Sequence, residues 1–382
     1  MSSRDKLVEI DIIRSLGILA VVLIHATADA TAFTGGGQVS GIGLAEGSPG
    51  QLFFVAINKL SYFAVPLFIF VSGLVLFHKY GRNWELGQTI TFYRKRLIRI
   101  VLPYLIWSMV YFTFFHLINT HSFTFDWAAF PRLLLWGEAS YHLYYLIIIL
   151  QFYLLFPFLL ILVQKVPLIR RLLLPIGLVL QAGFFVLSSW FVDIPKAPTL
   201  AISYLAYFLL GAAIGLEYER VSRWTNRRIG WLVSATVLSG FSFVSLFMAS
   251  RYFGYTLGRG WFEALLVVYV MSLSVTMLGL GRWSATRQPR QLAWYTSLGA
   301  ASFGIYLVHP LFLSVYRLSV APQESTIAYA FYTLIGFVWP LFGSWFVVVL
   351  YEAISWRKLG GRLLGMGRGA GEGKGAGKVH ES

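Results

Sequence analysis

The sequence of 382 residues contains no cysteine. Disulfide bonds, thiolate metal ligands and a cysteine-linked acyl intermediate are therefore excluded. Charged residues are also scarce, since they make up 12% of the chain, whereas 57% of the residues are hydrophobic. Soluble globular domains carry about 25% charged residues, so this composition is that of a membrane protein.

Apolar runs of about 20 residues, the length needed to cross a hydrocarbon core of about 30 Å, recur along nearly the whole chain. They predict one all-α bundle of about ten transmembrane helices. The predicted spans are residues 10–29, 60–78, 97–117, 143–163, 172–191, 200–216, 229–249, 261–280, 302–318 and 327–350.

Acidic residues are few, with 16 Asp and Glu against 31 Lys and Arg and a formal net charge of +15. Nucleic-acid binding would require the basic residues to cluster on a solvated face beside aromatic side chains, but here they lie between the apolar runs. Of the 31, 24 fall on one side of the predicted bundle, six fall on the other, and Arg14 lies inside the first span. Because cytoplasmic loops retain Lys and Arg, we predict that both termini are cytoplasmic.

The glycine-rich end of the chain is too poor in apolar residues to fold. We therefore expect residues 1–356 to form one transmembrane domain and residues 357–382 to form a disordered, basic cytoplasmic tail. We find no internal repeat of about 20 to 50 residues in the sequence.

The first predicted span carries polar residues that are costly in a bilayer. A charged side chain at the centre of a membrane helix costs about 2.5 to 3.5 kcal/mol, so such residues usually face the bundle interior and mark function. Asp11 and Arg14 can pair on one helix face, while Arg14 and His25 point within about 20° of the same direction, about 16 Å apart along the axis. Asp29, one turn beyond His25, is placed to accept the proton of the imidazole ring. Alternatively, Arg14 extends to lipid headgroups and His25 is a hydrogen-bonded packing residue.

Four basic residues between positions 94 and 99 precede Pro103 at the predicted cytoplasmic entry of the third span. Arg96 and Arg99 share a helix face. Guanidinium groups bind phosphates bidentately, which suits a phosphorylated carrier from the cytosol. The same residues also suit a topology anchor that contacts anionic lipid.

A second group of polar residues lies at the outer start of the fourth predicted span. Glu138 and His142 are one helical turn apart, on the same side of the membrane as Asp29. Tyr144 and Tyr145 follow directly, and we assign them mostly to the belt of aromatic residues that membrane proteins place at the lipid interface.

A third group lies near the middle of the ninth predicted span, where Tyr306, His309 and Pro310 follow one another closely. Proline frees a backbone carbonyl and kinks a helix, which is tolerated where something polar is buried. No two histidines or carboxylates combine a ligand spacing with a shared context, so the sequence indicates no metal site.

Together these residues resemble the acyltransferase-3 family of integral membrane O-acyltransferases, whose first span carries a basic residue and a histidine separated by ten positions. Arg14 and His25 fit that spacing, and Asp11 stands where the family often has an aspartate. Three further segments resemble family motifs in the family's order, namely residues 68–73, 96–103 and 305–310. Residues 142–146, with Gln151 and Pro157, further resemble the branch that includes the membrane protein of intercellular adhesin polysaccharide synthesis.

The resemblance implies transfer of an acyl group, usually acetyl, from cytosolic acyl coenzyme A to a hydroxyl of a surface glycan or its lipid-linked precursor. It implies a bacterial cytoplasmic membrane. Where relatives carry a fused extracytoplasmic hydrolase-like domain to finish the transfer, this chain would act alone or with a separate extracytoplasmic partner. Carried onto this chain, it makes His25 the general base or acyl carrier, and we favour the base because direct transfer needs no extra intermediate. The remaining roles are support of His25 by Asp29, binding of the coenzyme's phosphates by Arg14, Arg96 and Arg99, and sugar binding or proton relay by Glu138, His142, Tyr306 and His309.

An exporter of a glycan or small polar solute remains the main alternative. Such a protein would also need buried charges, aromatic side chains that bind sugar rings, and helices that proline interrupts. Adhesin-branch relatives have been regarded as exporters, although the chain shows no repeat between its halves. A structural scaffold gives no reason to bury Arg14 and His25. The two main alternatives differ chemically, because an enzyme that loses His25 should lose glycan modification and retain export.

Overall fold

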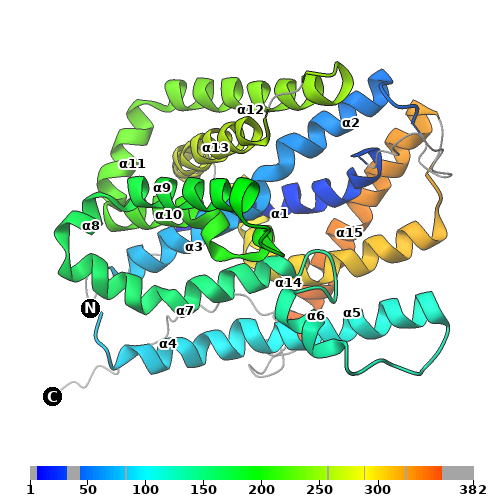
Figure 1. Ribbon diagram of the computed structural model, residues 1–382, viewed down its shortest axis with the longest axis horizontal. Helices are drawn as coiled ribbons and strands as arrows, with labels where there is room; N and C mark the ends of the chain where they lie inside the picture. Colours follow the sequence, from blue (N-terminus) through cyan, green and yellow to red (C-terminus); the bar gives the residue numbers. More distant parts are fainter. Residues whose placement is uncertain are drawn as a thin grey trace.

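The computed structural model describes residues 7–31, 44–81, 84–255, 258–287, 289–322 and 325–354. The predicted cytoplasmic tail, residues 357–382, lies outside the described residues. Within them the protein is built from helices and contains no strand, which confirms the predicted all-α fold. The helices run in chain order (Figure 1) as α1 Val8–Ala26, α2 Pro49–Leu60, α3 Ala64–Tyr80, α4 Gln88–Arg96, α5 Leu102–Thr120, α6 Phe130–Trp136, α7 Tyr144–Lys165, α8 Pro167–Arg171, α9 Leu173–Val186, α10 Leu205–Leu216, α11 Tyr218–Arg227, α12 Ile229–Tyr252, α13 Arg259–Arg287, α14 Pro289–Ser319 and α15 Thr326–Ile354.

Eight helical segments of the described chain are long and apolar enough to cross a membrane. A ninth is counted if the pair Ala201–Leu216 and Tyr218–Arg227, which is bent by 100°, forms one span. Helix α1 corresponds to the remaining predicted span, and its 19 residues include three charged ones, Glu9, Asp11 and Arg14. The prediction of a polytopic bundle is therefore confirmed.

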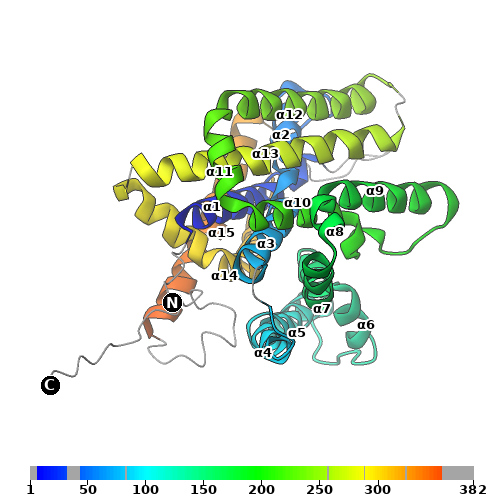
Figure 2. The same ribbon diagram turned by 90° about the vertical axis from the view of Figure 1, so that its left-hand side faces the viewer.

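Helix α1 lies inside the bundle, where α3, α13, α14 and α15 pack around it (Figure 2). Two of its three charged residues, Glu9 and Asp11, are buried, whereas the side chain of Arg14 remains 37% accessible. Figure 2 also shows α4 to α7 grouped on one side of the molecule, away from α12 and α13. A helix enclosed on all sides can keep charged groups at membrane depth, because neighbouring helices rather than lipid surround them.

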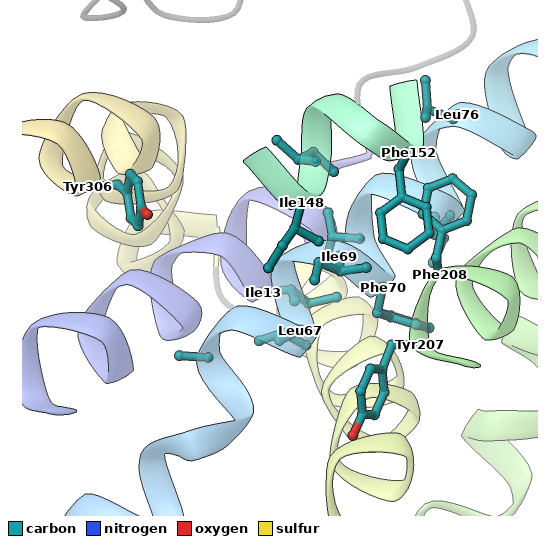
Figure 3. Packing of buried hydrophobic residues seen from close by; sticks show 14 of the residues in the cluster. Ile13, Leu67, Ile69, Phe70, Leu76, Ile148, Phe152, Tyr207, Phe208 and Tyr306 are labelled. Atoms are coloured by element: carbon teal, nitrogen blue, oxygen red, sulfur yellow. The ribbon is translucent and has the colours of Figure 1, made fainter. Parts of the chain in front are cut away.

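The centre of the core is aromatic and aliphatic (Figure 3). The rings of Phe152 on α7 and Phe208 on α10 stack with their centroids 4.2 Å apart. Around them, Ile69 and Phe70 of α3 are fully buried. This apolar centre links α3, α7 and α10 and leaves polar groups to the two ends of the bundle.

The sixth predicted span is less regular than its apolar sequence indicated. Residues 200–216 were expected to form one helix, but Ala201–Tyr204 form a 3₁₀ turn and α10 begins only at Leu205. Two glutamine side chains form hydrogen bonds with the backbone groups of this irregular segment. Gln151 donates to the Thr199 carbonyl at 2.8 Å and accepts from the Ala201 amide at 3.0 Å, and Gln181 accepts from the Ala206 amide at 2.9 Å. Irregular backbone at membrane depth is tolerated where it is buried in protein or lines a polar space.

Helices α3 and α10 approach each other so closely that glycine is required at the contact. A Cβ at Gly73 would overlap the Phe208 carbonyl oxygen, and a Cβ at Gly211 would overlap the carbonyl oxygen of Phe70. Small residues spaced four apart permit this approach in membrane bundles, and Gly215 continues the series.

Replacing Gly211 by alanine should therefore force α3 and α10 apart. We expect Gly211→Ala to lower Tm in detergent by several degrees, because overpacking a tight core costs about 1 to 3 kcal/mol. Gly183→Ala in α9 is the matched control, since an added Cβ there meets nothing within 4 Å. An equal Tm for the two variants would show that the contact is not tight.

Among the described residues, each ion pair between different elements joins two residues on the same predicted side of the membrane. On the predicted outer side, Arg251 pairs with Glu46 at 2.9 Å. On the predicted inner side, Arg170 pairs with Glu217 at 2.7 Å. The two ends of the bundle therefore agree with the predicted alternation, although the pairs do not say which end is cytoplasmic.

Cysteine labelling tests the predicted orientation without background, because the chain has no cysteine of its own. Phe123 and Leu86 are 83% and 74% exposed and lie on opposite predicted sides. In intact cells, a membrane-impermeant maleimide should label Phe123→Cys at once and Leu86→Cys only after permeabilisation. Labelling of Leu86→Cys alone in intact cells would invert the predicted topology.

Candidate functional site

Three histidines from distant parts of the chain meet in one cluster. His25 comes from the last turn of α1, His142 from the turn before α7, and His309 from the middle of α14. The ring centroid of His309 lies 5.5 Å from that of His25 and 5.7 Å from that of His142. His142 and His309 are buried, whereas His25 keeps part of its surface accessible. The three residues singled out in separate spans of the sequence therefore lie together.

The tautomer of His309 follows from its hydrogen bond. Its Nδ1 lies 2.9 Å from the backbone carbonyl of Ile305. A carbonyl oxygen can only accept, so Nδ1 carries the proton and Nε2 of the neutral ring presents its lone pair. This Nε2 is buried and has no hydrogen-bond partner among the described residues. Such a nitrogen is able to accept a proton from a ligand.

His142 is held from several directions. Its Nδ1 lies 3.1 Å from the Ser140 hydroxyl, and its backbone carbonyl accepts a hydrogen bond from the Tyr306 hydroxyl. The rings of Tyr306 and Tyr111 each have their centroid 5.1 Å from that of His142, and the Tyr111 hydroxyl donates to the Leu307 carbonyl at 2.6 Å. The His142 Nε2 is buried without a hydrogen-bond partner within the described ranges. Two buried imidazole nitrogens in one cluster thus remain free for a ligand.

Asp29 binds an arginine from α14. The Arg317 guanidinium pairs with the two carboxylate oxygens at 2.9 Å and 3.1 Å, and the Tyr332 hydroxyl donates to one of them at 3.2 Å. Arg317 also donates to the His25 backbone carbonyl at 2.8 Å. The spacing of Asp29 and His25 indicated a hydrogen bond between carboxylate and ring, but the carboxylate acts here on Arg317. Asp29 thus fixes the end of α1 against α14.

Glu138 also has a partner outside the histidine cluster. Its carboxylate forms an ion pair with Lys196, and both side chains are partly exposed. The structure therefore does not bring Glu138 and His142 together as their spacing suggested, since the Ser140 hydroxyl is the neighbour of the His142 Nδ1.

The three arginines lie on separate elements. The Arg14 guanidinium is 3.8 Å from the Asp11 carboxylate, which agrees with the expected pairing on one face of α1. Arg96, the last residue of α4, stacks over the rings of Phe92 and Tyr153 at 4.9 Å and 4.6 Å. Its Nε is buried without a hydrogen-bond partner in the described part of the chain.

Arg99 lies in the π-helical turn Leu97–Val101 that joins α4 to α5, and it is partly exposed. Tyr145 connects the arginine region with the histidines, because its ring lies 5.4 Å from the Tyr306 ring and its hydroxyl lies near Arg14 and Tyr153. Tyr145 thus points into the protein, although its position suggested an aromatic belt at the lipid interface.

Four residues of the site were not singled out from the sequence, namely Tyr111, Tyr141, Arg317 and Tyr332. Tyr141 packs on His25 with ring centroids 4.6 Å apart. Arg317 was counted only as one of the few outer basic residues, and that scarcity was the available signal of a special role. The tyrosines carry no such signal, because tyrosine is common in apolar helices of this chain.

Loss of the Arg317 guanidinium should destabilise the junction of α1 and α14. Both partners are partly buried, with 30% and 26% of their side chains accessible, so we expect Arg317→Gln to cost about 1 to 2 kcal/mol, below the value for a fully buried pair. Thermal unfolding should show a lower Tm, and adding Asp29→Asn should recover part of it. Arg251→Gln is the control, since that pair is more exposed; an equal loss in both would refute the special role of Arg317.

Comparison with known proteins gives two kinds of match. A family model described as an acyltransferase domain matches residues 7–349. Proteins of Staphylococcus aureus strains MSSA476, MW2 and MRSA252 are 25% identical over 266 residues, covering 67% of this chain and 71% of theirs. Each of them is named a probable poly-beta-1,6-N-acetyl-D-glucosamine export protein. No solved structure matches the chain.

Proposed function

The chain belongs to the acyltransferase-3 family, and from this premise we propose that it moves an acetyl group from cytosolic acetyl coenzyme A to a hydroxyl of an extracytoplasmic glycan or lipid-linked sugar. The family and the adhesin branch expected from the motifs are confirmed, and the protein is a multi-pass membrane acyltransferase. The donor and the acceptor are the proposal. The observation that carries it is the buried cluster of His25, His142 and His309, which holds two free imidazole nitrogens.

His25 is the proposed general base. Of the three histidines it alone keeps accessible surface, so it can meet the acceptor hydroxyl. It takes the hydroxyl proton as the oxygen attacks the thioester carbonyl, the carbon–sulfur bond breaks, and the proton passes to the departing thiolate to give free coenzyme A. His309 stacks on His25, and its Nε2 is a second acceptor for that proton. General base catalysis of this kind contributes about 10² to 10⁴ in rate.

The donor enters beside the arginines in this proposal. Arg96 presents a buried Nε that lacks a partner among the described residues, which fits a ligand with phosphate oxygens. Arg99 follows on the next turn and Arg14 lies closer to the histidines, near Tyr145. The pantetheine arm would pass from Tyr153 to Tyr145 and deliver the thioester toward Tyr306. Asp29 positions His25 through Arg317. Glu138 lies at the edge of the site in this proposal.

Export of a polysaccharide is the second candidate function, because the Staphylococcus aureus relatives are named as probable exporters. The buried histidines favour the transferase. An export path needs no pair of neutral imidazole nitrogens without partners, whereas proton abstraction from a hydroxyl needs at least one.

Calorimetry of acetyl coenzyme A with the purified protein in detergent tests the donor. Saturable binding is expected, and Arg96→Ala with Arg99→Ala should weaken it about 30-fold, since losing charge-assisted contacts worth about 2 kcal/mol in total changes affinity by that factor.

The matched control is Arg170→Ala with Arg171→Ala, a basic pair on the same predicted side, which should bind as the wild type does. Folding of each variant is verified by size exclusion and Tm. Failure of the folded wild type to bind any acyl coenzyme A would favour the exporter.

A further inference from the structure

Four tyrosines and one glutamate surround a common region beside the histidine cluster, at the predicted outer end of the bundle. They are Tyr62 in the 3₁₀ turn Ser61–Phe63, Tyr144 at the first position of α7, Tyr204 just before α10, Tyr207 in α10, and Glu263 in the second turn of α13. None of them entered the proposed chemistry. They come from five separate elements, so their meeting is a property of the fold.

Their polar groups face one another. The rings of Tyr204 and Tyr207 lie 6.4 Å apart at 44°. Helix α7, which begins with Tyr144, packs against the turn that ends with Tyr204, and α13, which carries Glu263, packs against the turn that holds Tyr62. The negative charge of Glu263 acts on both Tyr204 and Tyr207. Figure 3 shows the Tyr207 hydroxyl pointing away from the phenylalanines of the core.

These side chains are not simply interfacial tyrosines in contact with lipid. Tyr207 is 3% exposed, and Tyr144 and Tyr204 are largely enclosed by neighbouring side chains and keep only part of their surface accessible. In the described structure, no hydrogen bond engages the hydroxyls of Tyr144 and Tyr204. Hydroxyls in such surroundings are costly unless a ligand or water satisfies them.

The region is continuous with the histidine cluster. The Tyr306 hydroxyl, which donates to the His142 carbonyl, lies near Tyr144. The irregular backbone of residues 197–204, which Gln151 holds, carries Tyr204 and packs against α7. Nonhelical backbone at this depth is expected where a polar space is lined.

We propose that Tyr144, Tyr204, Tyr207 and Glu263 form the acceptor subsite and that they bind a neutral, polyhydroxylated sugar. Tyrosine rings provide flat faces for the C–H surface of a sugar, and tyrosine hydroxyls donate to or accept from sugar hydroxyls. A carboxylate only accepts, so Glu263 selects neighbouring hydroxyl donors and disfavours anionic sugars. Two cations lie at the edge of this group: the Lys59 ammonium donates to the Tyr62 hydroxyl at 2.6 Å and lies over the Tyr62 and Phe247 rings, and Arg259, one turn before Glu263 on α13, acts on the carboxylate.

This inference rests on the proposed function, because it states where the acceptor binds. The probe is a hexamer of β-1,6-linked N-acetylglucosamine, the sugar in the relatives' name, and binding is measured by calorimetry on protein in nanodiscs. The test variant combines Tyr204→Phe with Glu263→Gln, which nearly preserves shape and removes one hydroxyl and one negative charge. Tyr295→Phe with Glu217→Gln makes the same changes at exposed positions and serves as the control.

We expect saturable binding of the hexamer by the wild type and the control, about tenfold weaker binding by the test variant, and unchanged binding of acetyl coenzyme A by all three. Equal sugar binding by test and control variants would overturn the subsite, as would the absence of saturable sugar binding by the wild type. A protein that binds sugar through these residues but never acetylates it would retain the subsite and refute the transferase, so the two failures are distinguishable.

Discussion

The contact between α1 and α14 is the constraint on which the site depends. At one end a Cβ at Gly299 would overlap the Asp11 carbonyl, so the two backbones touch directly. At the other end Arg317 of α14 binds both Asp29 and the His25 carbonyl. Two fixed points leave little freedom to the helices between them, and the rings of His25 and His309 face each other at that level.

Polar side chains are arranged around this junction of α1 and α14. The centre of the bundle is filled by buried aromatic and aliphatic side chains. Arg96 stacks over aromatic rings at one end, while the histidines and the inward tyrosines occupy the other. A reaction that joins a donor from one side to an acceptor from the other requires this separation, with a path through Tyr145 between them.

Much of the fold was predictable from the sequence, because a membrane helix is defined by the length of its apolar run. The charge pattern predicted two ends of the bundle, and the observed ion pairs respect them. The span at residues 200–216 was misjudged, since hydropathy cannot detect that Gln151 and Gln181 stabilise an irregular backbone. Of the site, His25, His142 and His309 were found as separate polar residues, yet their convergence depends on the rotation and depth of packed helices, which a local pattern does not contain. The pairing of Asp29 with Arg317 was missed for the same reason, because helical spacing identifies only residues that are neighbours on one helix.

The central claim is that the histidine cluster transfers an acetyl group between two sides of one membrane. Its most direct test is a proteoliposome assay with radiolabelled acetyl coenzyme A trapped inside and the N-acetylglucosamine hexamer outside. Wild-type protein should label the outside sugar, and His25→Ala should lower the initial rate at least about 100-fold, as expected for loss of a general base. Undiminished labelling by His25→Ala, or a folded wild type that leaves the sugar unlabelled, would contradict the account.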